Sequence, residues 1–141
     1  MLNSLHGGTF YFHGSLLGFG GCDRFQFQTV DEEGVYGYLQ SEEDEAVGFV
    51  VVNPFLFYSD YGFEIEEQAK EALKLESHED AVILTIVTVQ EPFDQSTVNL
   101  LAPLVINLKT SQGRQLVLPP KQGSLGTREP LFRHVRAIRE E

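Results

Sequence analysis

Apolar and polar side chains alternate along several short stretches of the chain, a pattern typical of half-buried β-strands. The clearest cases are residues 24–30 (RFQFQTV) and 35–40, and residues 9–13 and 46–52 also have the composition of strands. Residues 81–90 (AVILTIVTVQ) differ, because they are apolar on both faces and rich in β-branched side chains. Such a composition predicts a central strand of a sheet.

The second half of the chain adds two strand-like stretches, and a helical stretch lies between the halves. Residues 98–108, interrupted at Pro103, and residues 115–118 have the composition of strands. Residues 66–75 have helical periodicity, because apolar side chains recur on one face from Ile65 onward. About seven short strands and one helix predict a mainly β fold. We expect a small, barrel-like, mostly antiparallel sheet with one short helix near 66–75.

The two ends of the chain differ from its middle. Residues 1–8 show no strand or helix pattern, so we expect them to be flexible, and we expect residues 9–131 to form a single β-barrel domain. In the C-terminal tail, residues 132–141, apolar side chains and arginines each recur every three positions. This spacing indicates a short C-terminal helix with one basic side.

The net charge of the chain argues against one class of function. The chain carries 21 acidic and 10 basic residues, a formal net charge of −11. Such an excess repels phosphate backbones, which argues against direct nucleic-acid binding. Residues 31–80 hold 15 of the acids and two of the bases. This acidic half is open to two interpretations, a solvated face or a surface that meets a partner.

Cysteine use and hydropathy indicate a cytoplasmic protein. The single cysteine, Cys22, excludes an intrachain disulfide, which suits a reducing compartment. The N-terminus lacks the pattern of a signal peptide. No apolar run approaches the roughly 20 residues that span a bilayer.

No motif in the chain points to catalysis. The four histidines have no metal-binding spacing, and Gly18–Gly21 lacks the order of a dinucleotide-binding loop. Serine, histidine and aspartate occur without the spacing of a nucleophile elbow or a triad. We therefore predict no enzymatic activity, no metal and no cofactor.

The block of residues 51–65 (VVNPFLFYSDYGFEI) carries the clearest candidate contact residues. Five of its side chains are aromatic: Phe55, Phe57, Tyr58, Tyr61 and Phe63. The three phenylalanines are either core residues or exposed ones, and the pattern leaves both readings open. Tyr58 and Tyr61 flank a predicted turn, so we expect them to be exposed. Aromatic side chains on exposed loops are common anchors in protein–protein contacts.

Three blocks together resemble the flagellar assembly factor FliW family. They are VVNPFLFYSDYGFEI, AVILTIVTV and NLLAPLVINLKTSQGRQLVL (residues 99–118), in this order and spacing. Residues 16–27 and 126–131 are similar to the two ends of the family pattern, so the resemblance covers residues 16–131. Leu17 and Glu129 depart from it, since the family commonly has Pro and His at these positions.

The resemblance implies a small, non-enzymatic, barrel-like protein with two competing partners. One is flagellin, bound through its C-terminal region before export. The other is the RNA-binding translational regulator CsrA, which the free protein binds and antagonises, relieving repression of flagellin mRNA. The alternative is a small-ligand-binding β-barrel of unrelated role, which requires an apolar cavity.

Two hypotheses place this function on residues. The first assigns partner contacts to the aromatic block and nearby strand edges: Asn53, Phe55, Tyr58, Asp60, Tyr61 and Asn107. The second assigns electrostatic exclusion of RNA to an acidic loop: Glu42, Glu43, Asp44 and Glu45. An acidic loop docked on an RNA-binding protein brings like charge toward the RNA backbone, and added salt weakens such repulsion.

Overall fold

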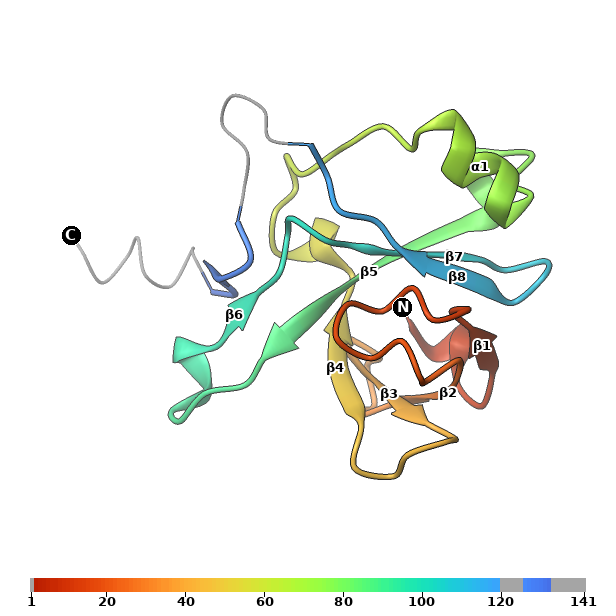
Figure 1. Cartoon of the computed structure of the whole chain (residues 1–141). Helices are drawn as coiled ribbons and strands as arrows, with labels where there is room; N and C mark the ends of the chain where they lie inside the picture. The colour runs from red at the N-terminus through yellow and green to blue at the C-terminus, as the bar shows by residue number, and fades with distance from the viewer. Residues whose placement is uncertain (1, 120–125, 133–141) are drawn as a thin grey trace.

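The computed structural model describes residues 2–119 and 126–132, and within them the chain is mainly β (Figure 1). Within these described residues, one α-helix, α1 (Glu67–Leu73), and four short 3₁₀ helices accompany the strands. The strands of the described residues are β1 (Thr9–Tyr11), β2 (Arg24–Thr29), β3 (Tyr36–Ser41), β4 (Gly48–Val52), β5 (Ala81–Thr88), β6 (Thr97–Val98), β7 (Leu104–Asn107), β8 (Gln112–Gln115) and β9 (Glu129–Pro130).

Seven of these strands close into a barrel. They follow the order β4-β3-β2-β1-β8-β7-β5, and β4 pairs with β5 to complete the ring. Every pairing in the ring is antiparallel except that of β1 with β8, which is parallel at Tyr11 and Gln112. The predicted barrel-like, mostly antiparallel sheet is therefore confirmed.

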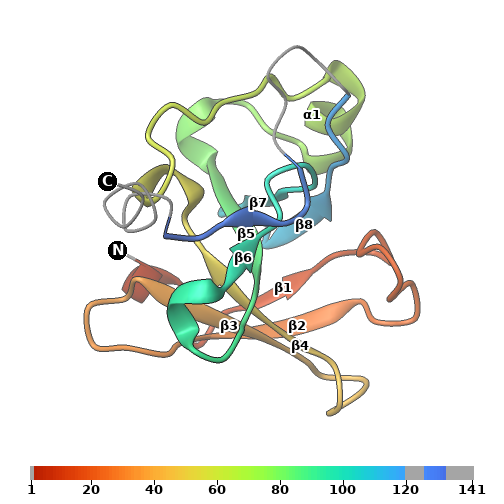
Figure 2. The ribbon, with the colours of Figure 1, turned by 90° about the vertical axis from the view of Figure 1, so that its left-hand side faces the viewer.

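Strand β5 belongs to the barrel and also leads out of it. Its first half, Ala81–Leu84, pairs with β7, whereas Val87 and Thr88 pair with β6, and β6 then pairs with β9. Thr85–Val87 pair with β4 and close the ring, and the chain leaves the barrel after them. The end of β5, the loop after it, β6 and β9 project from the barrel on the left of Figure 1 and face the viewer in Figure 2. We call residues 88–100 and 126–132 the wing.

The interior of the barrel is filled by a first hydrophobic core. Its largest fully buried side chains include Phe12, Phe25 and Phe27. The ring of Phe27 lies against Gly37 on the neighbouring strand so closely that a Cβ there would overlap it. Large side chains thus occupy the space that a ligand-binding barrel would need, and the described residues do not favour that alternative.

The first core also holds the N-terminus. A 3₁₀ helix, Leu2–Leu5, buries both leucines, and the Gly7 N–H donates to the Phe27 carbonyl at 2.8 Å. The prediction of a flexible segment over 1–8 was wrong for residues 2–8. It failed because two isolated leucines form too short a pattern to reveal a helix that packs on the first core.

A second core lies outside the ring, beneath the wing. Adjacent residues of a strand point to opposite faces of the sheet, so Val51 enters the first core and Val52 the second. On β5, Leu84 likewise lies in the first core and Val87 in the second. The buried members of the second core are Val52, Tyr58, Tyr61, Val87, Val98, Leu100 and Leu131.

Some predicted boundaries needed correction. The predicted helix is present as α1, shorter at both ends, with Ala69 and Leu73 buried. Strand β8 begins at Gln112 rather than 115, because the hairpin turns earlier, at Ser111, whose φ is 60°. The predicted C-terminal helix falls on 133–141, outside the described residues. None of the helices in the described part of the chain could cross a membrane.

Candidate functional site

The aromatic block bends at the end of β4. The Asn53 side chain accepts a hydrogen bond from the Phe55 N–H at 2.9 Å, which caps a 3₁₀ helix, Pro54–Leu56. Proline at the first position of this helix lacks the N–H that would need a partner there. The bend leaves Phe55 and Leu56 exposed, at 41% and 46%. Asn53 is half-exposed and acts here as a cap.

Tyr58 and Tyr61 are buried, so the prediction that they are exposed was wrong. They retain 2% and 8% of their surface. The Tyr58 hydroxyl donates to the Pro130 carbonyl, and the Tyr61 hydroxyl donates to the Leu100 carbonyl at 2.8 Å. A tyrosine can be buried when its hydroxyl finds such an acceptor, and burial raises the pKa of the Tyr61 phenol. These two bonds fasten the block to the wing.

Asn107 is also a structural residue in this fold. Its side chain is 1% exposed, donates to the carbonyls of Leu73 and Lys74, and accepts from the Lys109 N–H. It therefore closes the C-terminal end of α1 and presents no surface to a partner. Among the residues predicted to contact a partner, Phe55 and Asp60 are the exposed ones.

Four aromatic rings from distant segments form a closed circuit over the second core. Tyr36 and Phe93 have ring centroids 5.6 Å apart, and Phe93 and Phe132 are also 5.6 Å apart. Phe57 completes the circuit, 5.9 Å from Phe132 and 6.3 Å from Tyr36. Phe93 is 41% exposed and the other three rings are half-buried.

We define the aromatic patch as this circuit together with the two exposed side chains of the 3₁₀ helix: Tyr36, Phe55, Leu56, Phe57, Phe93 and Phe132. Sequence reasoning found its 55–57 portion but missed Tyr36, Phe93 and Phe132. Phe93 follows Pro92 in a loop between two strands. An aromatic side chain in such a loop could have indicated a contact residue from the sequence alone.

The acidic turn at 31–33 flanks the aromatic patch. The Asp31 carboxylate accepts hydrogen bonds from the Tyr36 N–H at 2.9 Å and the Val35 N–H at 3.2 Å. These bonds, led by that of Tyr36, hold the pKa of Asp31 below its usual value. The turn therefore positions Tyr36, and Glu32 and Glu33 beside it are exposed.

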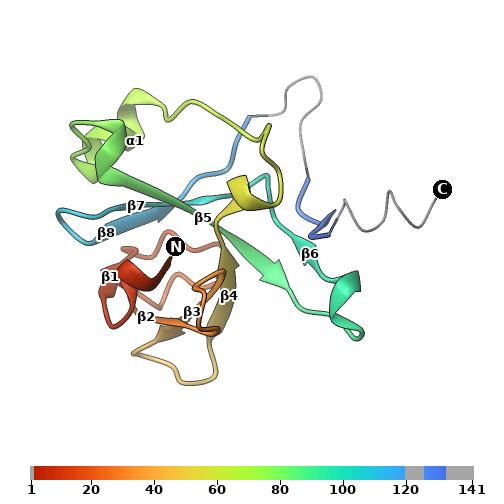
Figure 3. The same cartoon turned by 180° about the vertical axis from the view of Figure 1, so that it is seen from behind.

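The acidic loop of the second hypothesis, Glu42–Glu45, lies elsewhere. It joins β3 to β4 at the bottom of Figures 1 and 3, whereas the aromatic block follows the other end of β4. The five residues of β4 separate them by about 17 Å, at roughly 3.4 Å a residue, which exceeds the ~8 Å Debye length at physiological salt. The loop and the patch are therefore electrostatically separate surfaces.

Part of the loop is engaged by Arg24. The guanidinium Nε lies 3.8 Å from a Glu42 carboxylate oxygen and 4.0 Å from one of Glu43. The Arg24 N–H also donates to Glu43, at 3.1 Å. The Asp44 carboxylate accepts from the Ala46 N–H at 3.0 Å. All four acids remain exposed, and Arg24 offsets part of their charge.

Metal-binding groups do not accompany these surfaces. Across residues 2–119 and 126–132, no three His, Cys, Asp or Glu side chains gather in a way that could hold a metal ion. What the arrangement offers is an exposed apolar surface with an acidic margin, which is suited to binding a protein.

Comparison with known proteins gives one consistent result. A family model described as FliW protein matches residues 5–131. A flagellar assembly factor FliW from Bacillus licheniformis is 37% identical over 123 residues, which cover 87% of this chain and 85% of the relative. One from Bacillus subtilis is 35% identical over 120 residues, covering 85% and 82%. A crystal structure of the flagellar assembly factor FliW matches with a TM-score of 0.80 at 31% identity, covering 88% of this chain and 85% of that one.

Proposed function

Because the chain belongs to the FliW family of flagellar assembly factors, we propose that it binds flagellin in the cytoplasm and, when free, antagonises the translational regulator CsrA. Antagonism of CsrA relieves repression of flagellin mRNA, so the two partners compete for one protein. The family is regulatory rather than enzymatic, and the proposed activity is binding alone, without a cofactor or direct contact to nucleic acid.

The observation that carries the flagellin proposal is the exposed aromatic patch. Contiguous exposed apolar surface on a soluble protein marks a contact site. The C-terminal region of flagellin is amphipathic, and an amphipathic helix binds by laying its apolar face on such a surface. Phe55, Leu56 and Phe93 are each more than 40% exposed, so they can supply the contacts without unfolding the barrel.

Co-purification with flagellin and with CsrA, separately and in competition, tests the proposal. We expect Phe93→Ser to weaken flagellin binding about tenfold, which corresponds to about 1.4 kcal/mol. Leu108→Ser is the matched control, because Leu108 is 43% exposed on the β7–β8 turn, away from the wing. Equal binding by both variants would remove the aromatic patch from the proposal.

We propose further that the acidic loop opposes RNA binding when CsrA is bound. The double variant Asp44→Asn, Glu45→Gln removes two charges and leaves the contacts of Arg24 with Glu42 and Glu43 in place. We expect it to weaken inhibition of RNA binding, and salt should do the same as the Debye length falls from ~10 Å at 0.1 M to ~3 Å at 1 M. Inhibition that survives both changes would point to a steric or conformational mechanism.

A further inference from the structure

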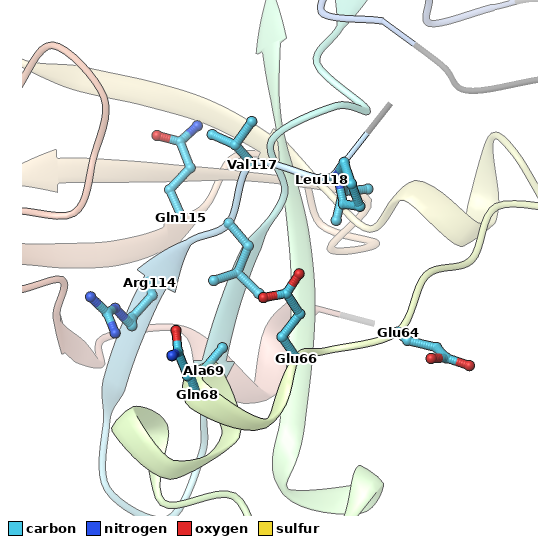
Figure 4. Close-up of a pocket in the computed structure, with 10 residues that line it drawn as sticks. Glu64, Glu66, Gln68, Ala69, Arg114, Gln115, Val117 and Leu118 are labelled. Atoms are coloured by element: carbon cyan, nitrogen blue, oxygen red, sulfur yellow. The ribbon is translucent and has the colours of Figure 1, made fainter. Parts of the chain in front are cut away.

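An open groove of about 270 Å³ lies between the N-terminal end of α1 and the extended segment after β8 (Figure 4). Its apolar lining includes Ala69 of α1 and Leu116 and Leu118 of the segment. Backbone hydrogen bonds hold the segment in place, from Leu116 to the Pro103 carbonyl and from Leu118 to the Leu101 carbonyl, each at 2.9 Å. The groove is therefore part of the fixed framework.

The polar lining of the groove is unevenly charged. Glu64 and Glu66 lie along the chain that leads into α1, and Gln68 and Arg114 lie toward the other end. In Figure 4 the carboxylate of Glu66 points into the groove toward Leu118, while the Glu64 and Arg114 side chains point outward at the two ends. A bound molecule thus meets apolar carbon and a carboxylate at the same place.

Glu66 is a poor residue for the structural position it occupies. It is the N-cap of α1, yet its side chain makes no capping hydrogen bond. Short polar side chains are preferred at an N-cap because they accept from the first N–H groups of the helix. Within the described part of the chain, the Glu66 carboxylate also takes part in no ion pair.

The groove carries a small excess of negative charge. Its charged lining residues are Glu64, Glu66 and Arg114, which are two acids and one base. On α1 beside the groove, Lys70 is paired with the carboxylate of Glu67 at 3.9 Å. A concentration of one sign of charge along a cleft attracts groups of the opposite sign and repels acidic ones.

From these observations we infer that the groove is a second contact surface, which binds a short segment of a protein partner that carries a lysine or arginine beside an apolar side chain. The apolar side chain packs on Ala69, Leu116 and Leu118, and the basic one faces Glu66. The volume lies below the roughly 300–1,000 Å³ of pockets that enclose small molecules, and the groove is open, which favours a peptide.

This surface is distinct from the aromatic patch but adjoins the same core. Leu118, which lines the groove, also packs against the second core. In Figure 1 helix α1, whose first turn lines the groove, lies at the upper right, and the wing projects to the left. The inference goes beyond the proposed function, and it holds whichever partner occupies the aromatic patch.

A synthetic peptide, Gly-Ser-Leu-Lys-Leu-Lys-Ser-Gly, tests the inference with the full chain. Titration followed by amide chemical shifts should move signals of residues 64–69 and 114–118, and the same peptide with glutamate for lysine should move none. Glu66→Lys should weaken binding roughly fivefold or more, as expected when an exposed ion pair is lost and reversed. Glu71→Lys, the same charge change on α1 outside the groove, is the control.

A second variant separates contact from structure. Glu66→Ser supplies the preferred kind of N-cap, so the melting temperature should stay the same or rise while peptide binding falls. The inference is overturned if binding survives Glu66→Lys, if the glutamate peptide binds equally well, or if the shifted signals lie outside the groove. It is also overturned if sedimentation velocity shows that a second copy of the chain fills the groove and Glu66→Lys abolishes that association.

Discussion

The two hydrophobic cores bury side chains equally well but are built from different chemistry. The first core is packed inside the closed ring and consists of phenylalanine and aliphatic side chains with Cys22. The second lies between the outside of the ring and the wing, and includes two tyrosines that bond to wing carbonyls. At its edge the rings of Phe57 and Phe132 are half-buried, and the ring of Phe93 beside them is exposed.

This difference between the two cores indicates which part of the fold can contact a partner. This barrel is closed and its interior is filled by large side chains, so side chains in the first core act through stability. The second core is covered by a narrow wing, which leaves a rim of aromatic side chains at the surface. The second core therefore contains side chains that stabilise the fold and, at its rim, side chains that can contact a partner. Substitutions at buried and at exposed positions should distinguish these two roles.

The largest effect is expected in the first core. Phe27→Ala removes a fully buried ring that packs against Gly37, and should lower the free energy of unfolding by about 3–5 kcal/mol. Domains of this kind have about 5–15 kcal/mol in total, so much of the stability is lost. Urea unfolding followed by circular dichroism measures it.

Gln28→Ala, at the next and exposed position of β2, should change stability by less than about 0.5 kcal/mol. A cost below about 1 kcal/mol for Phe27→Ala would mean that the barrel interior is loosely packed and that the contrast between the cores is wrong.

A smaller effect is expected at the bond between the block and the wing. Tyr61→Phe keeps the ring but leaves the Leu100 carbonyl without this buried donor, which should cost about 1–2 kcal/mol of stability. Tyr11→Phe, at a 37% exposed tyrosine, is the control and should be neutral. If urea midpoints of the two variants coincide, the wing is held by packing alone.

The sequence predicted the barrel well, because strands such as β2 and β3 alternate, and β5 is apolar on both faces as a central strand should be. It failed at Tyr58 and Tyr61, since the pattern of the block contains no information about the acceptors at Pro130 and Leu100. Those carbonyls lie 72 and 39 positions away along the chain. A tyrosine beside a turn is exposed unless tertiary structure supplies such an acceptor.

The aromatic patch was only partly predictable for the same reason. Its 55–57 portion is continuous in sequence, whereas Phe93 and Phe132 reach it through the fold of the wing. Strand β9 contains two residues, one of them Pro130, which is too short a stretch for any alternation to show. The wing is thus defined by pairing between distant residues rather than by local pattern.

A third prediction contrasts two rings that touch each other. Phe55 and Tyr61 have centroids 5.7 Å apart, but Phe55 is exposed and Tyr61 is buried. Phe55→Ser should change the free energy of unfolding by less than about 1 kcal/mol, while flagellin binding measured by calorimetry falls severalfold. A large loss of stability would mean that Phe55 stabilises the second core, and Phe93 would then be the better residue for testing partner contact.

The smallest effect concerns the turn that positions Tyr36 in the aromatic patch. Hydrogen bonds from the Tyr36 and Val35 N–H groups lower the pKa of Asp31 in the folded protein. A carboxyl with a depressed folded pKa stabilises the fold above its unfolded pKa of about 3.9, and this contribution is lost as pH falls through the folded value.

Asp31→Asn should therefore be less stable than the natural chain at pH 7, and the difference in urea midpoint should shrink below about pH 4. Glu32→Gln removes the same charge from the same turn but leaves the bonds to Val35 and Tyr36 intact. A difference of equal size for both variants would mean that the charge of the turn, rather than its hydrogen bonds to Tyr36, supports this side of the second core. A difference that is independent of pH would mean that the ionised carboxylate of Asp31 adds no stability. In that case the acidic margin of the aromatic patch serves partner contact rather than the placement of its rings.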